Sequence, residues 1–149
     1  IDFAASCQSL MNLNISDTGV ANLAPLSALS SLANLNFSKT KVTDLSPILS
    51  LPLKSLYAAG LSIGDQGLSV VCSVPTLETL DLSDNGITDV SAIIKLKYLK
   101  VLNISGNTAS NISVLTGCSS LETVSCARTG ITRNDMANLG KFNITAITD

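Results

Sequence analysis

The chain has 149 residues, of which 46% are hydrophobic and 13% charged, and its net charge is −2. This composition is too apolar for a disordered chain, and the length suits one domain of ordinary size. Polar residues interrupt every apolar run and the lysines and arginines are scattered, so the sequence predicts neither a membrane-spanning helix nor a basic face for nucleic acid.

A repeated motif organises the chain from end to end. Each copy reads L-x-x-L-x-I or a close variant, and successive copies start 22, 21, 24, 22 and 22 residues apart. Apolar and polar residues alternate within the motif, which predicts a short strand with its apolar side chains turned to the core. Six full copies start at Leu10, Leu32, Leu53, Leu77, Leu99 and Leu121, and a partial copy carries Ile144 and Ile147.

Two further positions recur after each strand. The residues twelve positions after the starts are mostly helix-capping types, namely Asn22, Asp44, Asp65, Asp89, Asn111 and Arg133. We therefore expect a capped helical turn on the outer side of each repeat. The residue eight positions after each start should hydrogen-bond to the backbone N–H and C=O groups of a buried turn. These residues are Thr18, Thr40, Leu61, Asn85, Asn107 and Thr129. Leu61 has no polar group, so the third turn should be built differently.

The third and sixth copies carry longer outer segments than the others. The third reads IGDQGLSVVCSVPTL, with apolar Leu68 and Val71, and the sixth reads ITRNDMANLGKFNI, with Met136 and Leu139 at the matching places. Apolar residues three apart lie on one face of a helix. We predict α-helical segments near residues 66–73 and 133–140, and 3₁₀ or single turns in the other copies.

Segments such as NISDTGVANLAPLSAL and NFSKTKVTDLSPILSL resemble the leucine-rich-repeat family, in its short class of about 22 residues as found in internalins. The third and sixth copies resemble the ribonuclease-inhibitor type of repeat. The resemblance implies a right-handed α/β solenoid, with a parallel sheet on the concave side and 3₁₀ or short α-helical turns on the convex side. It also implies protein binding by the concave face. We interpret residues 1–149 as a single domain with partial repeats at both ends, and as a fragment of a larger protein.

The polar residues interleaved with the strand leucines should line the concave face. Tyr57 is the only aromatic residue among them. We predict a shallow, hydrogen-bonding groove for a partner, formed by Asn14, Asn36, Tyr57, Asp81, Asn103 and Arg128. The alternative interpretation is that these are simply the solvent-tolerant positions of the repeat.

The sequence offers little catalytic chemistry. It has no histidine, the commonest general base, and it lacks the glycine-rich loops that hold phosphates and the spacing of an EF-hand. The four cysteines, Cys7, Cys72, Cys118 and Cys126, have no CxxC spacing and fit the core as small hydrophobic residues. We expect no enzyme activity, no cofactor and no metal site.

The sequence thus predicts an interaction module of a scaffold or regulatory protein, a cytoplasmic monomer that binds another protein or peptide. It predicts no nucleic-acid partner, no membrane insertion and no small-molecule substrate. The alternatives are a bacterial or parasite surface adhesin that binds a host protein, and a cytoskeletal spacer. Five glycosylation sequons, which we interpret as by-products of the repeat, start at Asn14, Asn36, Asn103, Asn111 and Asn143.

Overall fold

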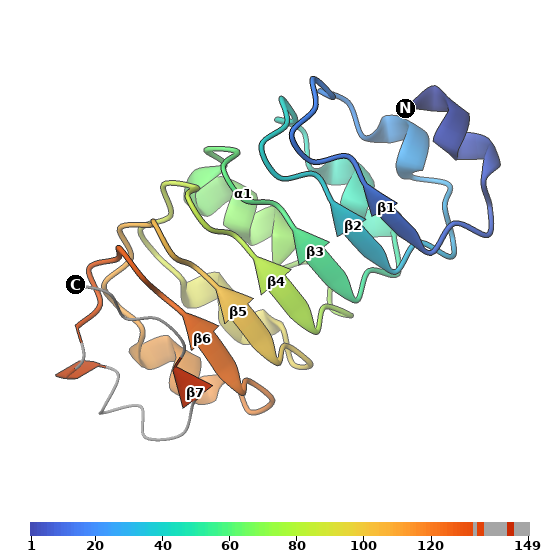
Figure 1. The fold of residues 1–149 in the computed structure, drawn as a ribbon. Coiled ribbons are helices and arrows are strands. Elements are labelled where there is room, and N and C mark those ends of the chain that lie inside the picture. The colour runs from blue at the N-terminus through green and yellow to red at the C-terminus, as the bar shows by residue number, and fades with distance from the viewer. Residues whose placement is uncertain (133, 136–142, 145–149) are drawn as a thin grey trace.

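The computed structural model describes residues 1–132, 134–135 and 143–144. Seven short strands lie side by side in chain order and pair in parallel, which confirms the predicted parallel sheet (Figure 1). The first six begin two residues after the predicted repeat starts. The strands are β1 (Asn12–Asn14), β2 (Asn34–Asn36), β3 (Ser55–Tyr57), β4 (Thr79–Asp81), β5 (Val101–Asn103), β6 (Thr123–Ser125) and β7 (Asn143–Ile144).

The helices lie behind the sheet and leave its other face uncovered, and we call that uncovered side the concave face (Figure 1). One of them, α1 (Gly64–Val71), is an α-helix, close to the predicted segment 66–73. The predicted helix near 133–140 lies almost wholly outside the described residues. The remaining turns are 3₁₀ helices, as predicted: η1 (Asp2–Ser6), η2 (Ala24–Leu26), η3 (Ser46–Ser50), η4 (Ser91–Lys95) and η5 (Ser113–Gly117).

The core is a stack of leucines between the sheet and the helices. The middle residues of successive strands are in register, so β2 to β5 each bury a strand leucine against their neighbours, and β6 buries Val124. Helix residues such as Ile48, Leu68 and Ile93 close the other side. Cys72, Cys118 and Cys126 are buried, as predicted, whereas Cys7 is exposed at the end of η1, so its assignment to the core was wrong. No disulfide links the four cysteines.

The turn after each strand depends on the residue eight positions after the repeat start. Thr40 closes its own turn by donating to the Phe37 carbonyl, at 2.7 Å. Asn107 instead reaches into the preceding repeat, where its side-chain oxygen accepts from the Asn85 and Ile87 N–H groups at 3.1 and 3.0 Å. Threonine thus satisfies groups within its repeat, and asparagine joins two repeats.

The third turn is built differently, as the sequence predicts for Leu61. The Leu61 N–H donates to Oδ1 of Asn85 in the next repeat, at 3.0 Å, and Nδ2 of Asn85 donates to the Ala58 carbonyl at 2.7 Å. Asn85 and Asn107 are both only 1% exposed. A buried asparagine of the fourth repeat therefore supplies the hydrogen bonds that the third repeat lacks.

At three of the predicted capping positions the side chain does bond the start of the following helix, but from one residue before the N-cap. Asn22, Asp44 and Asp89 each accept from the N–H of the first residue of the following 3₁₀ helix, at 2.8, 2.9 and 2.8 Å. The Ser46 N–H, followed by the Ser46 hydroxyl, holds the pKa of Asp44 below its usual range, and the Ser91 hydroxyl, followed by the Ser91 N–H, does the same for Asp89. Asn111 accepts from the Ser113 hydroxyl instead, and Arg133 lies outside the described residues.

The prediction that Asp65 caps a helix was wrong. Asp65 lies within the first turn of α1, because that helix begins at Gly64. Its carboxylate accepts from the Thr88 N–H and hydroxyl, at 2.8 and 2.6 Å, and from the Asp89 N–H at 3.1 Å. These bonds, led by that from the Thr88 hydroxyl, lower the pKa of Asp65. Asp65 therefore binds the third repeat to the fourth.

Candidate functional site

Five of the six predicted site residues form one row across the concave face. The strand register pairs Asn14 with Asn36, Asn36 with Tyr57, Tyr57 with Asp81 and Asp81 with Asn103. We call the residues that end strands β1 to β6 the last-position row, and those that begin the same strands the first-position row. The last-position row continues to Ser125. The sixth predicted residue, Arg128, lies in the turn after β6.

Most side chains of the last-position row are held by their own strand. The side-chain oxygens of Asn14, Asn36, Asp81 and Asn103 each accept the N–H of the serine two residues later, at 2.9, 3.0, 2.9 and 3.1 Å. This local bond turns the chain away from the strand. One side-chain oxygen of each residue is therefore committed to the fold. We did not predict this role, although the repeated pattern of Asn or Asp followed two residues later by Ser signals it.

Tyr57 interrupts the pattern of hydrogen bonds in the last-position row, and Ser38 of the preceding repeat supplies the missing acceptor. A tyrosine side chain does not make the local turn bond. The residue two positions later, Ala59, instead donates its N–H to Oγ of Ser38, at 3.1 Å. The sixth repeat uses the same device, with Ala127 N–H donating to Ser105 Oγ at 3.2 Å. The Tyr57 ring is thus not needed for the turn and stands on the concave face with 38% of its surface exposed.

A shallow hollow of about 260 Å³ lies on the concave face over β1 to β3, with Tyr57 on its border. Its lining contains no ionised side chain. Within it, Nδ2 of Asn34 donates to Oδ1 of Asn12, at 2.6 Å, across the two strands. The hollow is lined by Asn12, Leu13, Asn14, Asn34, Leu35, Asn36 and Tyr57. The structure therefore brings Asn14, Asn36 and Tyr57 together, and it places Asp81, Asn103 and Arg128 outside the hollow.

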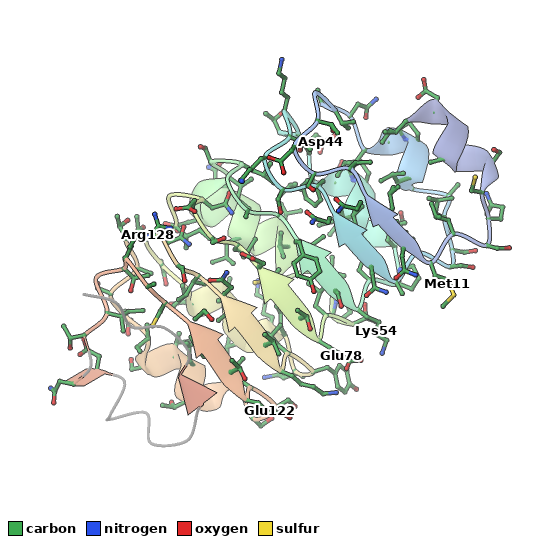
Figure 2. All side chains as sticks on the ribbon, viewed as in Figure 1. Met11, Asp44, Lys54, Glu78, Glu122 and Arg128 are labelled. Atoms are coloured by element: carbon green, nitrogen blue, oxygen red, sulfur yellow. The ribbon has the colours of Figure 1, made fainter. Side chains whose placement is uncertain are left out.

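Charged side chains lie along the edge of the sheet where the strands begin. We call Lys54, Glu78 and Lys100 the Glu78 ladder. The Glu78 carboxylate lies between Lys54 and Lys100, with 2.7 Å from each Nζ to a different carboxylate oxygen. The hydrogen bond from Lys100, followed by that from Lys54, lowers the pKa of Glu78 to about 2. Lys54, Glu78 and Glu122 lie along this edge, whereas Arg128 lies toward the opposite one (Figure 2). The ladder borders the concave face without crossing it.

The opposite edge carries the predicted residue Arg128. Its guanidinium lies 3.2 Å from the Asp84 carboxylate, and both groups are largely exposed. At this turn the backbone of every repeat is left-handed, with positive φ angles at Asp17, Lys39, Gly60, Asp84, Gly106 and Arg128. Arg128 is therefore a flank of the concave face and not part of the row.

Two exposed apolar residues near the start of β5 were not among the predicted site residues. Tyr98 is 64% exposed and Val101 is 39% exposed. The sequence signals both residues, because each differs in type from the residues at the same position of the other repeats. Tyr98 stands where the other repeats have Ser9, Ser31, Pro52, Thr76 and Ser120, and Val101 is the single apolar residue in the first-position row.

The convex side has a larger hollow, of about 380 Å³, between η3 and α1. Leu49, Leu61, Ile63 and Val70 contribute its apolar lining. It lies where a repeat with a 3₁₀ helix meets the repeat with the α-helix. The hollow therefore follows from the change of repeat type, which the sequence signals by the longer third copy.

The described residues contain no group of three or more histidine, cysteine, aspartate or glutamate side chains arranged to hold a metal ion. None of the helices in the described part of the chain has the length and apolar character that crossing a bilayer requires. Glu78 and Asp84 beside the concave face are engaged in the ion pairs given above, and the Asp81 carboxylate accepts from the Ser83 N–H and from Nδ2 of Asn103. The site therefore consists of hydrogen-bonding and aromatic groups.

Comparison with known proteins identifies the repeat type. Residues 75–117 match the family model described as Leucine Rich repeats (2 copies). No curated protein sequence matches the chain. Among solved structures, an internalin of Listeria monocytogenes is 23% identical with a TM-score of 0.61, over 100% of this chain and 59% of its own. Internalin C2 of the same organism is 23% identical with a TM-score of 0.76, over 95% of this chain and 73% of its own.

The Arabidopsis receptor kinase HAESA, solved in complex with the peptide hormone IDA and the co-receptor SERK1, is also similar. It is 18% identical with a TM-score of 0.68, over 95% of this chain and 26% of the receptor. At these identities the likeness shows the fold alone. The repeated frame and the parallel sheet give the chain the fold of a leucine-rich-repeat solenoid, and the family model of that repeat matches residues 75–117.

Proposed function

We propose that this chain is the protein-interaction module of a scaffold or regulatory protein, and that it binds its partner by the concave face. One observation carries the proposal. In a row whose other members are small and polar, Tyr57 places an exposed aromatic ring beside a hollow, and the preceding repeat takes over the hydrogen bond that this position otherwise makes. An aromatic residue in such a place is a typical anchor for a protein partner.

A binding role also agrees with the family, since leucine-rich repeats generally act as binding modules and not as enzymes. Two carboxylates beside the concave face, Glu78 and Asp84, form ion pairs with lysine and arginine, and the Asp81 carboxylate on the face accepts from Ser83 and Asn103. Glu78, with its pKa near 2, stays ionised at neutral pH and is unsuited to general acid or base work there. The groups that remain available on the face include amides, hydroxyls, the Tyr57 ring and the Val101 side chain.

The proposed interface has few anchors, which bears on affinity. Besides Tyr57, the exposed apolar side chains near the concave face include Val101 on β5, Tyr98 at the edge and Met11 directly before β1. Most of the energy of a tight interface comes from a small number of large aromatic or arginine side chains. We therefore expect modest affinity from this chain alone, with Arg128 and the other flanking charges setting orientation.

The test is a comparison of three proteins in binding to the partner that wild type captures by cross-linking. The double variant Tyr57→Ala, Asp81→Lys removes the ring and reverses a charge in the same row. The control, Leu49→Ala, trims an exposed apolar residue on the convex side. We expect the double variant to lose the partner and the control to keep it. Unchanged binding by the double variant would contradict the proposal.

The likeness to two Listeria internalins favours a second candidate, a bacterial surface protein that binds a host protein. The two candidates differ in location, because the first is expected in the cytoplasm and the second at the cell surface. The parent sequence discriminates between them. A signal peptide together with a cell-surface anchor supports the second candidate, and a coding sequence without them supports the first.

A further inference from the structure

We infer that the hollow over β1 to β3 receives an extended peptide segment of the partner and recognises it by its backbone carbonyl oxygens. The inference rests on the proposed function and assigns it to one half of the concave face. The first observation behind it is which side-chain atoms of the four asparagines in the hollow already make hydrogen bonds within the protein. These asparagines are Asn12, Asn14, Asn34 and Asn36. The second observation is the absence of ionised groups in the lining of the hollow.

The orientation of two of these amides is fixed by the fold. Oδ1 of Asn14 accepts from the Ser16 N–H, and Oδ1 of Asn36 accepts from the Ser38 N–H. A flipped amide would place its NH₂ group against a backbone N–H, and two donors do not bond. Nδ2 is therefore the outer end of each side chain. Within the described residues, neither Nδ2 group donates to the protein.

The other two asparagines add a third donor. Because Nδ2 of Asn34 donates to Oδ1 of Asn12, the available ends of this pair are Nδ2 of Asn12 and Oδ1 of Asn34. The hollow thus presents three amide donors, on Asn12, Asn14 and Asn36, against one amide acceptor. A ligand that fits this surface must offer more acceptors than donors toward it.

The charge of the surface selects among acceptors. No lysine or arginine lines the hollow, so a carboxylate or phosphate would lose hydration without gaining an opposite charge. Carbonyl oxygens carry partial negative charge and complement the partial positive charge of the amide hydrogens at a smaller desolvation cost. A peptide backbone supplies one carbonyl per residue.

The spacing of the donors fits an extended peptide. Asn12 and Asn14 are two residues apart on β1, and strand residues rise by about 3.3 Å each, so the two side chains start roughly 6.6 Å apart. An extended segment presents its alternate carbonyls on one side at the same interval. The volume, about 260 Å³, lies below the range for a drug-sized ligand and suits a short stretch of a longer chain packed against Tyr57.

The decisive variant is Asn14→Asp combined with Asn36→Asp. Aspartate keeps the oxygen that accepts the serine N–H but replaces the outer NH₂ with a second oxygen, so the donor becomes an acceptor with negative charge. Asp81 shows that aspartate is compatible with this row, because it makes the same bond to the Ser83 N–H at 2.9 Å. The matched control is Asn22→Asp combined with Asn111→Asp, the same change at two capping positions away from the concave face, where Asp44 and Asp89 show that aspartate fits.

The probes are linear peptides selected on wild type from a random display library, and a glycan array screened in parallel. Wild type should bind selected peptides, and the double variant should bind them at least about tenfold more weakly, since two hydrogen bonds are lost and repulsion replaces them. The control should bind within about twofold of wild type. Equal affinity of the double variant, selection of no peptide, or binding of glycans alone would overturn the inference.

The outcome is separable from the fate of the proposed function. A native partner that is lost from Tyr57→Ala, Asp81→Lys but retained at wild-type affinity by Asn14→Asp, Asn36→Asp would leave concave-face binding intact and refute recognition of carbonyls by these amides. A native partner retained by both double variants would refute both proposals.

Discussion

Arg128 and Asp84 form an ion pair that spans two repeats, with 3.2 Å between the guanidinium Nη2 and the carboxylate Oδ1. The repeat between them contributes Gly106, at the same turn position and with a φ angle of 69°. A Cβ atom on Gly106 would overlap the Asp84 carboxylate and approach the Arg128 guanidinium. The missing side chain of Gly106 therefore lets charges in non-adjacent repeats meet.

Gly106→Ala should destabilise the chain by roughly 1 to 2 kcal/mol, because an L-residue in the left-handed region is strained and because the new methyl group displaces Asp84. Urea unfolding would measure this loss. Gly130→Ala is the control, since a Cβ there meets its nearest atom at an ordinary 3.4 Å. Adding Asp84→Ala to Gly106→Ala should recover part of the loss. An unchanged midpoint in Gly106→Ala would show that the turn is looser than described.

Asn85→Ala should be among the most damaging single changes, at about 3 kcal/mol or more, because it leaves the part-buried Leu61 N–H and the buried Ala58 carbonyl without partners. Thr40→Val removes one local bond at the equivalent position of the second repeat and should cost about 1 kcal/mol. Chemical unfolding of both variants compares them. Equal effects would mean that bonds between repeats contribute no more than bonds within them.

Glu78→Gln should remove a pH-dependent part of the stability. The pKa of Glu78 is lowered from 4.5 to about 2 in the folded chain, so the stabilisation is fully present above pH about 4.5 and is lost as the pH falls toward 2. The difference in unfolding free energy between wild type and Glu78→Gln should therefore shrink across this window. It should also shrink with added salt, because the pairs are exposed.

The control for that experiment is Glu122→Gln, which removes a carboxylate from the same position of the sixth repeat. No short lysine contact to Glu122 occurs in the described part of the chain. Glu122→Gln should therefore lower the unfolding free energy at neutral pH by less than Glu78→Gln does. Equal losses in the two variants would refute a special role for the Glu78 ladder.

The thiols should react with an alkylating reagent at very different rates in the folded chain. Burial raises the pKa of Cys72 to about 12, so its thiolate is scarce at pH 8, whereas Cys7 is exposed. We expect mass spectrometry to detect rapid modification of Cys7 and protection of Cys72 until denaturant is added. Similar rates at the two sites would show that the outer side of α1 opens readily.

The sequence predicted the fold well because the fold is periodic. A strand leucine that recurs every 22 residues or so has one way to be buried, and the strands lie where the motif places them. The cap at Asp65 failed for a local reason. The longer third copy begins its helix at Gly64, so a residue that precedes the helix in other repeats lies inside it here.

The site was less predictable because its main features are departures from the repeat. Alternation placed Asn14, Asn36 and Tyr57 on one face, and they do line one hollow. It did not reveal that Oδ1 of each asparagine is bonded to its own turn, nor that Ser38 replaces this bond for Tyr57. Those facts depend on which atoms of neighbouring repeats meet, and a periodic pattern treats all repeats alike. That these residues bind a partner stays a prediction.

Asn85 and Asn107 hydrogen-bond to the preceding repeats, and these bonds determine which repeats can be deleted without loss of hydrogen bonds. A single repeat does not satisfy all of its own backbone hydrogen bonds. In the third and fourth repeats, backbone N–H groups donate to the side chain of an asparagine in the repeat that follows. Deleting the fifth copy would put the Thr129 turn after the fourth repeat and leave the Asn85 and Ile87 N–H groups without their acceptor, whereas copies closed by Thr18 or Thr40 make this side-chain bond within the repeat. Gain or loss of a repeat during evolution should therefore cost less stability near the N-terminus of this chain than in its middle.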